Sequence, residues 1–267
     1  VGGRIYIAHH DYAPRAITNI MGTWVIETPA FTGDRTFSSS GNYPGVVFTL
    51  AGRLGFGATE NEPTAIFLSR SPDAMTGAMR YTDFSFTTRG GYLSPDNAIY
   101  LLESDLAPIL WAIGGRRLFT GMQRQIWMDV GAGVTPVDLD MTVLSNNGSS
   151  GAQAVMSETI IVYVGRGGKS LHALLYNPGA DAYQEATLSI GAEHFLTSPI
   201  VDMAIQNFPS PVLWLVRQDG LLVSVSLDVT SGMIAWARHP MAGDAVVESV
   251  VVGHASDEDI AWFVVRR

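Results

Sequence analysis

The chain contains no cysteine, few charged residues and no long apolar run, and each absence excludes a class of protein. Without cysteine there is no disulfide, no thiolate nucleophile and no cysteine-ligated zinc. No stretch approaches the roughly 18 consecutive apolar residues of a membrane-spanning helix, so we expect no membrane insertion. Charged residues make up 15% and hydrophobic residues 47% of the 267 positions. That balance excludes intrinsic disorder, which requires low hydrophobicity and high net charge.

The charges that are present are mainly acidic. Lysine and arginine number 16 against 25 aspartates and glutamates, which gives a formal net charge of −9. An acidic surface repels phosphate backbones, so we do not expect the chain to wrap nucleic acid unless its arginines cluster. The chain begins at Val1 with a strand-like run and without methionine, which is not the pattern of a signal peptide. We therefore expect a processed or partial chain.

Helical periodicity is nearly absent, and short segments rich in Val, Ile, Leu, Trp and Tyr take its place. They end at Gly, Asn, Asp or Pro, which is typical of strands and hairpins. The clearest unit has four expected strands, at residues 200–206, 212–217, 221–227 and 233–238. Asp219-Gly220 should supply the positive φ angles of a two-residue hairpin, and a second turn is expected from Asp228 to Gly232.

The same layout recurs along the chain and predicts a β-propeller of five or six four-stranded antiparallel blades, closed by terminal strands. The other expected strands are residues 4–9, 16–20, 23–27, 46–50, 54–58, 65–69, 83–87, 109–113, 117–121, 125–129, 138–144, 159–164, 171–176, 246–252 and 260–266. We expect a single propeller domain over residues 1–267, with loop insertions from Phe31 to Tyr43 and from Ser71 to Asn97. We also expect a short helix over residues 72–79, although Gly77 disfavours it. A pair of β-sandwiches is the alternative fold.

A glycine-rich segment, residues 165–170, is similar at first sight to a phosphate-binding loop. That motif requires glycine where Tyr163 stands, and it must lead into a helix, whereas residues 171–176 are strand-like. A hairpin turn is therefore the better interpretation. The Gly-x-Ser-x-Gly nucleophile elbow is also absent, and Ser149 and Ser150 lie in a polar turn.

Histidines and acids do not form a recognisable active site. His9, His10 and Asp11 are candidate metal ligands, but adjacent side chains on a strand point to opposite faces. The other histidines, which lack ligand spacing, are His172, His194, His239 and His254. The acids near strand ends, which a glycosidase would need in a pair, are Asp129, Asp138, Asp140, Asp202 and Glu248. We interpret them as turn and hydrogen-bonding acids, and we predict no catalytic, cofactor-binding or metal site and no enzymatic activity.

Aromatic residues give a similarly structural interpretation. The six tryptophans are Trp24, Trp111, Trp127, Trp214, Trp236 and Trp262. Exposed aromatics would suit a sugar-binding surface, but aromatics on strands usually pack between sheets. We therefore expect most of the tryptophans in the core.

Several short motifs follow one another in a fixed order. In the C-terminal half they are residues 148–150, 162–168, 175–176, 192–196, 202–204, 209–217, 219–220, 235–239, 247–250 and 260–267, and upstream they are residues 43–48, 52–54, 67–70 and 115–121. The series resembles the tail tubular B, or tail nozzle, proteins of short-tailed bacteriophages and related prophages. It departs from their pattern at Gly45, where an arginine would follow Pro44, and the chain is shorter than typical members.

The resemblance implies a virion protein assembled in the host cytoplasm. Its propeller would belong to a homo-oligomeric ring, hexameric in the family, at the end of the phage tail. The implied partners are identical subunits, other tail proteins, and double-stranded DNA only in transit during ejection. An acidic lumen would let DNA slide, and a structural protein needs no cofactor. The alternatives are a glycan-binding or glycan-cleaving propeller that contacts the host surface, and a bacterial interaction propeller.

Overall fold

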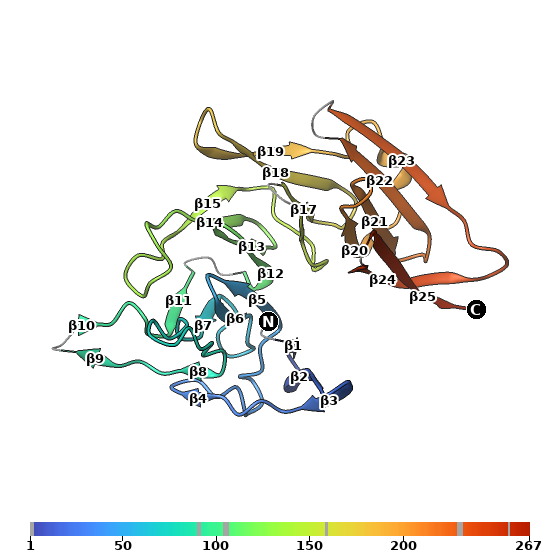
Figure 1. Cartoon of the computed structure of the whole chain (residues 1–267). Coiled ribbons are helices and arrows are strands. Elements are labelled where there is room, and N and C mark those ends of the chain that lie inside the picture. Colours follow the sequence, from blue (N-terminus) through green and yellow to red (C-terminus); the bar gives the residue numbers. More distant parts are fainter. Residues whose placement is uncertain (1–2, 90–91, 104–106, 158–159, 229–231, 256) are drawn as a thin grey trace. The chain divides into compact units, whose positions relative to one another are not determined.

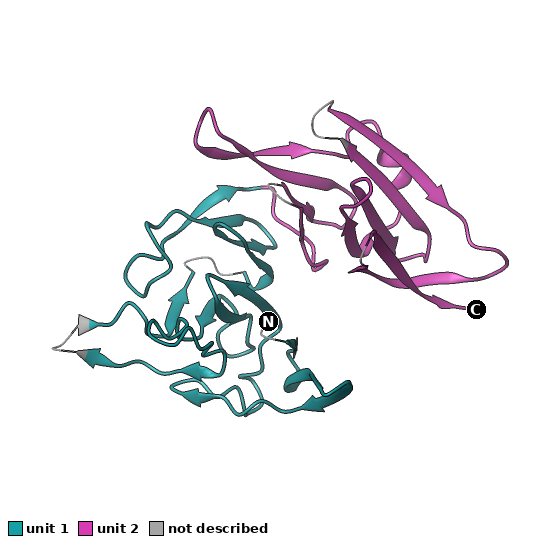
Figure 2. Ribbon diagram, in the orientation of Figure 1, with its two compact units in different colours: residues 1–146 teal, residues 147–267 magenta. Residues whose placement is uncertain are grey.

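The computed structural model describes residues 3–89, 92–103, 107–157, 160–228, 232–255 and 257–267. Within them the chain is all-β, with small, mostly antiparallel sheets and a single short 3-10 helix, Glu193–Phe195 (Figure 1). None of the described helical residues forms a segment long and apolar enough to cross a membrane. Contacts divide the chain into two compact units, residues 1–146 and 147–267 (Figure 2). The expectation of a single domain over residues 1–267 stays a prediction.

The described part of unit 1 contains one three-stranded and two four-stranded antiparallel sheets. The three-stranded sheet consists of β1 (Arg4–His9), β2 (Tyr12–Ile20) and β3 (Thr23–Glu27). The next has the spatial order β11-β7-β6-β5, from β5 (Val46–Leu50), β6 (Arg53–Gly57), β7 (Ala65–Leu68) and β11 (Ile99–Leu102). The last runs in sequence order through β12 (Ile109–Gly114), β13 (Leu118–Met122), β14 (Ile126–Asp129) and β15 (Met141–Ser145). The inner strands β6 and β13 are buried at every position, so both of their faces are covered.

In unit 2 every strand of the described sheets pairs with its neighbour in sequence. One four-stranded sheet consists of β16 (Val155–Ser157), β17 (Ile160–Val164), β18 (Leu171–Asn177) and β19 (Ala182–Thr187). Another consists of β20 (Ile200–Gln206), β21 (Val212–Arg217), β22 (Leu222–Asp228) and β23 (Met233–His239), and a two-stranded sheet of β24 (Val246–His254) and β25 (Asp259–Arg266). The core is aliphatic and includes the fully buried Val162, Val164, Leu213, Leu215 and Val223. Closure by terminal strands stays a prediction.

Most predicted strands are confirmed to within a few residues, but the fourth strand of the β5–β7 sheet is not the predicted one. Residues 83–87 do not join that sheet. Asp83–Phe84 forms the two-residue β8, which pairs in parallel with β4 (Thr32–Gly33). The fourth strand is β11, whose Ile99 is buried in the core. Within residues 83–87 Phe84 is buried and Phe86 is exposed, so the segment presents no continuous buried face to a sheet.

The two expected loop insertions pack against the sheet beside them. In their described parts they contain only two-residue strands: β4, β8, β9 (Thr88–Arg89) and β10 (Tyr92–Leu93), whereas residues 90–91 lie outside the described residues. Phe31, Phe37 and Phe84 from the insertions meet Phe56 of β6, and the Phe37 ring centroid lies 5.0 Å from that of Phe56 and 5.1 Å from that of Phe84. The insertions therefore add an aromatic layer to the core of unit 1.

The helix predicted over residues 72–79 is wrong. The segment turns instead, because Asp73 Oδ1 accepts hydrogen bonds from the backbone N–H groups of Met75 and Thr76, both at 3.0 Å. Gly77 has a φ of +67°, which lies in the left-handed region and is incompatible with a right-handed helix. An aspartate that bonds its own following backbone favours a turn over a helix.

Arg53 of β6 binds the backbone at both ends of the insertion expected from Ser71 to Asn97. Its side chain is only 1% exposed, and Nη1 donates to the carbonyl oxygens of Ser69 at 2.8 Å and Asn97 at 2.6 Å. Nη2 donates to the carbonyl of Pro95 at 2.9 Å. Burial lowers the pKa of Arg53 to about 10, so the guanidinium stays charged at neutral pH. One side chain thus joins β6 to both ends of a segment of about thirty residues.

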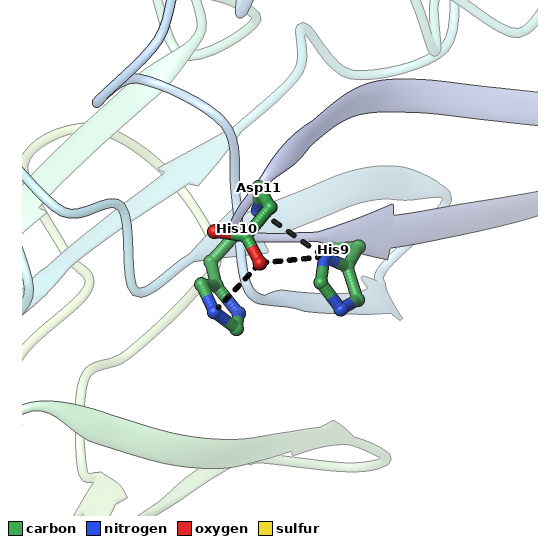
Figure 3. Close-up of side chains that lie close together, drawn as sticks. All are labelled: His9, His10 and Asp11. Carbon is green, nitrogen blue, oxygen red and sulfur yellow. Dashed lines mark hydrogen bonds and ion pairs between the residues drawn. The ribbon is translucent and has the colours of Figure 1, made fainter.

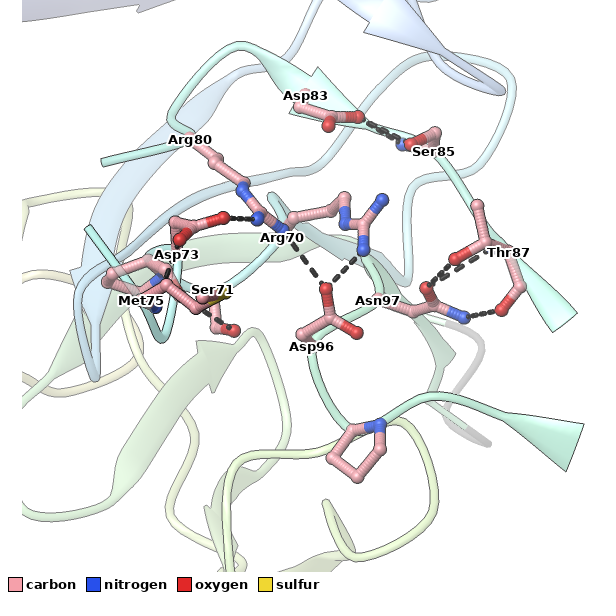
Figure 4. Close-up of polar contacts among 12 residues, drawn as sticks. Arg70, Ser71, Asp73, Met75, Arg80, Asp83, Ser85, Thr87, Asp96 and Asn97 are labelled. Carbon is pink, nitrogen blue, oxygen red and sulfur yellow. Dashed lines mark hydrogen bonds and ion pairs between the residues drawn. The ribbon is translucent and has the colours of Figure 1, made fainter. Parts of the chain in front are cut away.

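Ion pairs close the same insertion on itself (Figure 4). Arg70 and Arg80 both contact the carboxylate of Asp96, the second at 3.0 Å, and Arg80 also pairs with Asp73. Hydrogen bonding from Ser94, with Arg70 beside it, lowers the pKa of Asp96 to about 2. The carboxylate of Asp96 is therefore ionised at neutral pH.

The glycine turns of unit 2 are confirmed as hairpin turns, with one correction. Gly220 has a φ of +79°, and its N–H donates to the carbonyl of Arg217 at 2.8 Å. Asp219 does not take a positive φ, so the loop is the three-residue type with a glycine bulge, not the two-residue type expected. In the other turn Gly167 and Gly168 have φ of +90° and +78°. Residues 229–231 of the turn expected from Asp228 to Gly232 lie outside the described residues.

We expect Gly220→Ala to destabilise the protein more than Gly191→Ala. Both glycines have φ near +78°, so each substitution should cost about 1–3 kcal/mol in backbone strain. A Cβ at Gly220 would also lie 2.4 Å from Cβ of Val246, whereas nothing lies within 4 Å at Gly191. Thermal unfolding measures the difference. Equal melting temperatures for the two variants would show that Gly220 does not pack against Val246.

Arg53→Lys should lower the free energy of unfolding by about 1–3 kcal/mol. A lysine ammonium cannot reach all three carbonyl groups that the guanidinium binds, so at least one would be left buried without a donor. Arg266→Lys is the matched control, because the Arg266–Glu248 pair is exposed (70% and 48% of the side chains) and should contribute under about 1 kcal/mol. Denaturant titration of both variants tests this, and an equal loss would rule out the anchoring role of Arg53.

Candidate functional site

Two of the candidate acids of unit 1, Asp129 and Asp138, accept local hydrogen bonds. Asp129 is 2% exposed, and its Oδ1 accepts the backbone N–H groups of Gly131 at 2.8 Å and Asp140 at 3.2 Å. Asp138 Oδ2 accepts the hydroxyl of Thr135 at 2.6 Å. These contacts shape the loop between β14 and β15, which agrees with the interpretation of turn acids.

The candidate acids of unit 2 also have partners. Asp202 accepts the backbone N–H groups of Met203 and Val250, both at 2.9 Å. Burial raises the pKa of Asp202 above its usual range. Glu248 accepts a hydrogen bond from Arg266 Nε at 2.6 Å across β24 and β25. Asp202 thus ties β20 to β24, and its carboxylate is already used by the backbone.

A buried cluster that the sequence did not indicate lies in the β16–β19 sheet. Ser170 Oγ is 3.0 Å from His172 Nε2, and His172 Nδ1 is 3.0 Å from Glu185 Oε1. Glu185 Oε1 also accepts the hydroxyl of Tyr163 at 2.8 Å. His172 is 8% exposed, and burial lowers its pKa despite the attraction of Glu185. Positions 170 and 172 share a strand face, but no signal pointed to Glu185, because β19 was not predicted.

The chemistry open to this cluster is general-base activation of a hydroxyl, since a neutral imidazole between a carboxylate and a serine can accept the serine proton. Its packing favours a structural role instead. Ser170 Oγ lies over Gly165, where a Cβ would be 2.3 Å away. The Tyr163 ring stacks on the imidazole with centroids 5.3 Å apart. We interpret the cluster as a polar link between β17, β18 and β19.

A cavity of about 200 Å³ in unit 2 offers no chemistry of its own. It is aliphatic, lined among others by Ile160, Leu175, Leu188, Leu227 and Ile234. A glycan-cleaving site would need a pair of acids and stacking aromatics, and the residues that line this cavity include neither.

The histidines of unit 2 lie in separate local contacts. His239 Nε2 is 2.8 Å from Ser224 Oγ, and its ring lies 5.3 Å from that of Trp214. His254 binds the carboxylate of Asp259, and His194 packs against Phe195. His9 and His10 of unit 1 do come together, contrary to the alternation argument, because only His9 belongs to β1 and His10 lies in the turn (Figure 3).

The tryptophans divide into two groups. Trp111 and Trp127 are buried, and Trp214 and Trp236 pack partly buried against the core. The expectation that most of the tryptophans pack in the core is confirmed, and the exceptions are Trp24 and Trp262, which are 60% and 62% exposed. Both lie in sheets that present one apolar face to solvent, and the strand pattern alone could not show that these faces lack a cover.

The first exposed face belongs to the β1–β3 sheet. Ile5, Ile17 and Ile26 are in register across the three strands and share that face. Ile5 and Ile26 are 54% and 69% exposed, and Ile7 and Trp24 lie on the same face, where they pair with the exposed Arg15 and Asn19. The opposite face, which includes Tyr6 and Ala8, packs toward the aromatic core. We call this set the first apolar face: Ile5, Ile7, Trp24 and Ile26, which are exposed, and the half-buried Ile17.

The second exposed face belongs to the β24–β25 sheet. Val251 pairs with Trp262 and Ser249 with Val264, and all four side chains share one face with Ile260. Val251, Trp262 and Val264 are each more than half exposed. Val250 and Phe263, on the other face, pack on the core. We call Val251, Ile260, Trp262 and Val264 the second apolar face.

Comparison with known proteins gives the fold. No family model and no curated protein matches the chain. A Bacteroides uniformis protein provisionally named a 6-phosphogluconolactonase is similar over 90% of this chain and 69% of its own, with a TM-score of 0.56 and 12% identity. The β-propeller domain of Myceliophteria thermophila Cps50 (Swd1) is similar over 92% of this chain and 74% of its own, with a TM-score of 0.51 and 10% identity. The fold is a β-propeller.

The propeller assignment confirms the predicted fold class and removes the alternative of paired sandwiches. The four-stranded sheets are its blades, each a run of antiparallel strands. At identities of 10% and 12% the two comparisons extend to the fold and not to activity.

The buried His172 should make stability depend on pH. The unfolded chain carries a histidine that titrates near 6.5, whereas burial lowers the pKa of His172 in the propeller. Between the two values the unfolded state binds more protons, so the free energy of unfolding should fall as the pH drops below about 6.5. His172→Gln should flatten this slope, and His194→Gln, an exposed control, should retain it. Denaturant titrations from pH 7.5 to 5 test the expectation, and an unchanged slope in His172→Gln would contradict it.

Proposed function

We propose that the chain is a structural protein of a bacteriophage tail, a nozzle or tail tubular component that assembles with identical subunits into a ring around the DNA exit channel. The ordered motifs of the sequence resemble that family, and a propeller is the fold that the resemblance implies. The observation that carries the proposal is the pair of exposed apolar faces on β1–β3 and β24–β25.

Exposed apolar patches of this kind typify surfaces that pack on another protein. Each face contains a tryptophan, Trp24 or Trp262, that is at least 60% exposed. Tryptophan is enriched at the energetic centres of protein interfaces. Covering these side chains would contribute about 25 cal/mol for each Å² of apolar surface removed from water.

The partner that we assign to both faces is a second copy of the chain. The faces are different surfaces of one molecule, so the first apolar face of one copy against the second of the next is a head-to-tail contact. Repeated head-to-tail contacts generate a ring when the rotation closes. Other tail proteins would then bind the two rims of that ring.

The charge of the chain suits a conduit for DNA. With 25 acidic and 16 basic residues the net charge is −9, so few contacts would neutralise phosphate and DNA would pass without being held. This role requires no cofactor and no catalytic group. The protein would reside in the virion after assembly in the host cytoplasm.

Light scattering with negative-stain imaging tests the proposal. We expect rings of several subunits for the unmodified chain. Ile26→Glu and Trp262→Glu should each reduce the mass to that of a monomer, because a carboxylate would be buried in the contact. Met75→Glu is the control, since Met75 is 97% exposed and lies in neither face.

Two results would contradict the proposal. One is a chain that stays monomeric at every concentration reached. The other is a ring whose mass is unchanged in both face variants, which would place the contact elsewhere.

A further inference from the structure

The turn between β1 and β2 gathers three side chains that can ligate a metal ion (Figure 3). His9 ends β1, and His10 and Asp11 form the turn. A register shift between Ile7 and His9 and the turn itself break the alternation that would send adjacent side chains to opposite faces. As a result the two imidazole rings stack, with centroids 4.6 Å apart and planes inclined by 17°.

The separations of the ligand atoms suit one small cation. His10 Nε2 lies 3.4 Å from Asp11 Oδ2, and His9 Nδ1 lies 3.9 Å from the same oxygen. All three ligand atoms lie within 4.8 Å of one another. Two ligands held tetrahedrally at about 2.1 Å from zinc are about 3.4 Å apart. One pair already has this spacing, and the others reach it by small rotations of side chains that are at least half exposed.

The hydrogen bonding of the turn uses His9 Nδ1 as an acceptor. The backbone N–H of Asp11 donates to His9 Nδ1 at 3.1 Å, so this nitrogen acts as an acceptor and can bind a metal in exchange. The exchange costs little, because the freed N–H is exposed and can bond water. The Tyr12 ring, 5.3 Å from that of His9, packs beside the site.

We propose that this turn binds a divalent transition-metal ion, Zn²⁺ in the first place, through His9, His10 and Asp11 with water in the remaining position. Two imidazoles and one carboxylate select zinc, nickel or copper over calcium and magnesium, which prefer all-oxygen sites. The proposal is independent of ring formation. It departs from the sequence-based prediction of no metal site, which for His9, His10 and Asp11 rested on strand alternation.

Calorimetric titration of the full, untagged chain with ZnCl₂ tests the site, together with the visible absorption of Co²⁺, which reports tetrahedral coordination. We expect one ion per chain. His10→Ala and Asp11→Asn should each weaken binding by at least about tenfold. His194→Ala is the matched control, because His194 is exposed and lies in unit 2, and it should bind zinc as the unmodified chain does.

Circular dichroism of each variant checks that the fold is retained. Absence of saturable zinc binding by the unmodified chain would overturn the proposal. So would binding that survives both His10→Ala and Asp11→Asn, or binding that His194→Ala removes.

Discussion

Each sheet of a propeller needs a cover on both of its faces, and this requirement governs how the rest of the chain is built. Two inner strands, β6 and β13, are buried at every position. Large rings find room there because glycines stand opposite them. Trp111 lies against Gly121, where a Cβ would be 2.0 Å from the indole, and Phe48 lies against Gly55, where a Cβ would be 2.4 Å from the ring. Ring-over-glycine pairs thus fill the space between neighbouring strands.

The sheets at the two ends of the chain obey the same requirement only in part. β1–β3 and β24–β25 each have one face on a core and one face in water, and the uncovered faces carry Ile26, Trp24 and Trp262. Each of these two sheets therefore packs on a core through one face only, and its other apolar face is available to pack on another protein surface. In the proposed ring a neighbouring copy of the chain covers the exposed face, so that each terminal sheet is packed on both of its faces.

Most strands could be predicted from the sequence because the residues that mark a strand and its turns lie next to one another in the chain. Short apolar runs bounded by glycine, asparagine and proline are enough for hairpins such as β21–β22, where Gly220 takes the positive φ that the turn requires. The predictions failed where a strand pairs with a segment that is distant in the sequence. β11 joins β7 from across an insertion, and Asp83–Phe84 pairs with β4 instead of the expected sheet. Neither pairing has a signal within its own window.

The functional groups show the same division. Some candidate acids bond close in sequence, as Asp129 does to the backbone N–H of Gly131, whereas Asp202 and Glu248 lie within strands and bond across the sheets. The link from Ser170 through His172 to Glu185 depends on the pairing of β18 with β19, which the sequence did not indicate. The juxtaposition of His9 and His10 depends on where a strand stops, and strand ends are the least predictable feature of a sequence.

The connection of β7 to β11 has a consequence for the order in which the protein folds. In unit 2 each strand pairs with the next in sequence, so its blades need to close only short loops. In unit 1 residues 69–98 separate β7 from β11, and the insertion within that gap must also meet β4 through Thr32 and Asp83. Closing long loops costs entropy before the contacts repay it, and sequence-distant contacts slow folding. Unit 2 should therefore form its sheets first during refolding, and the insertions should order last around Arg53.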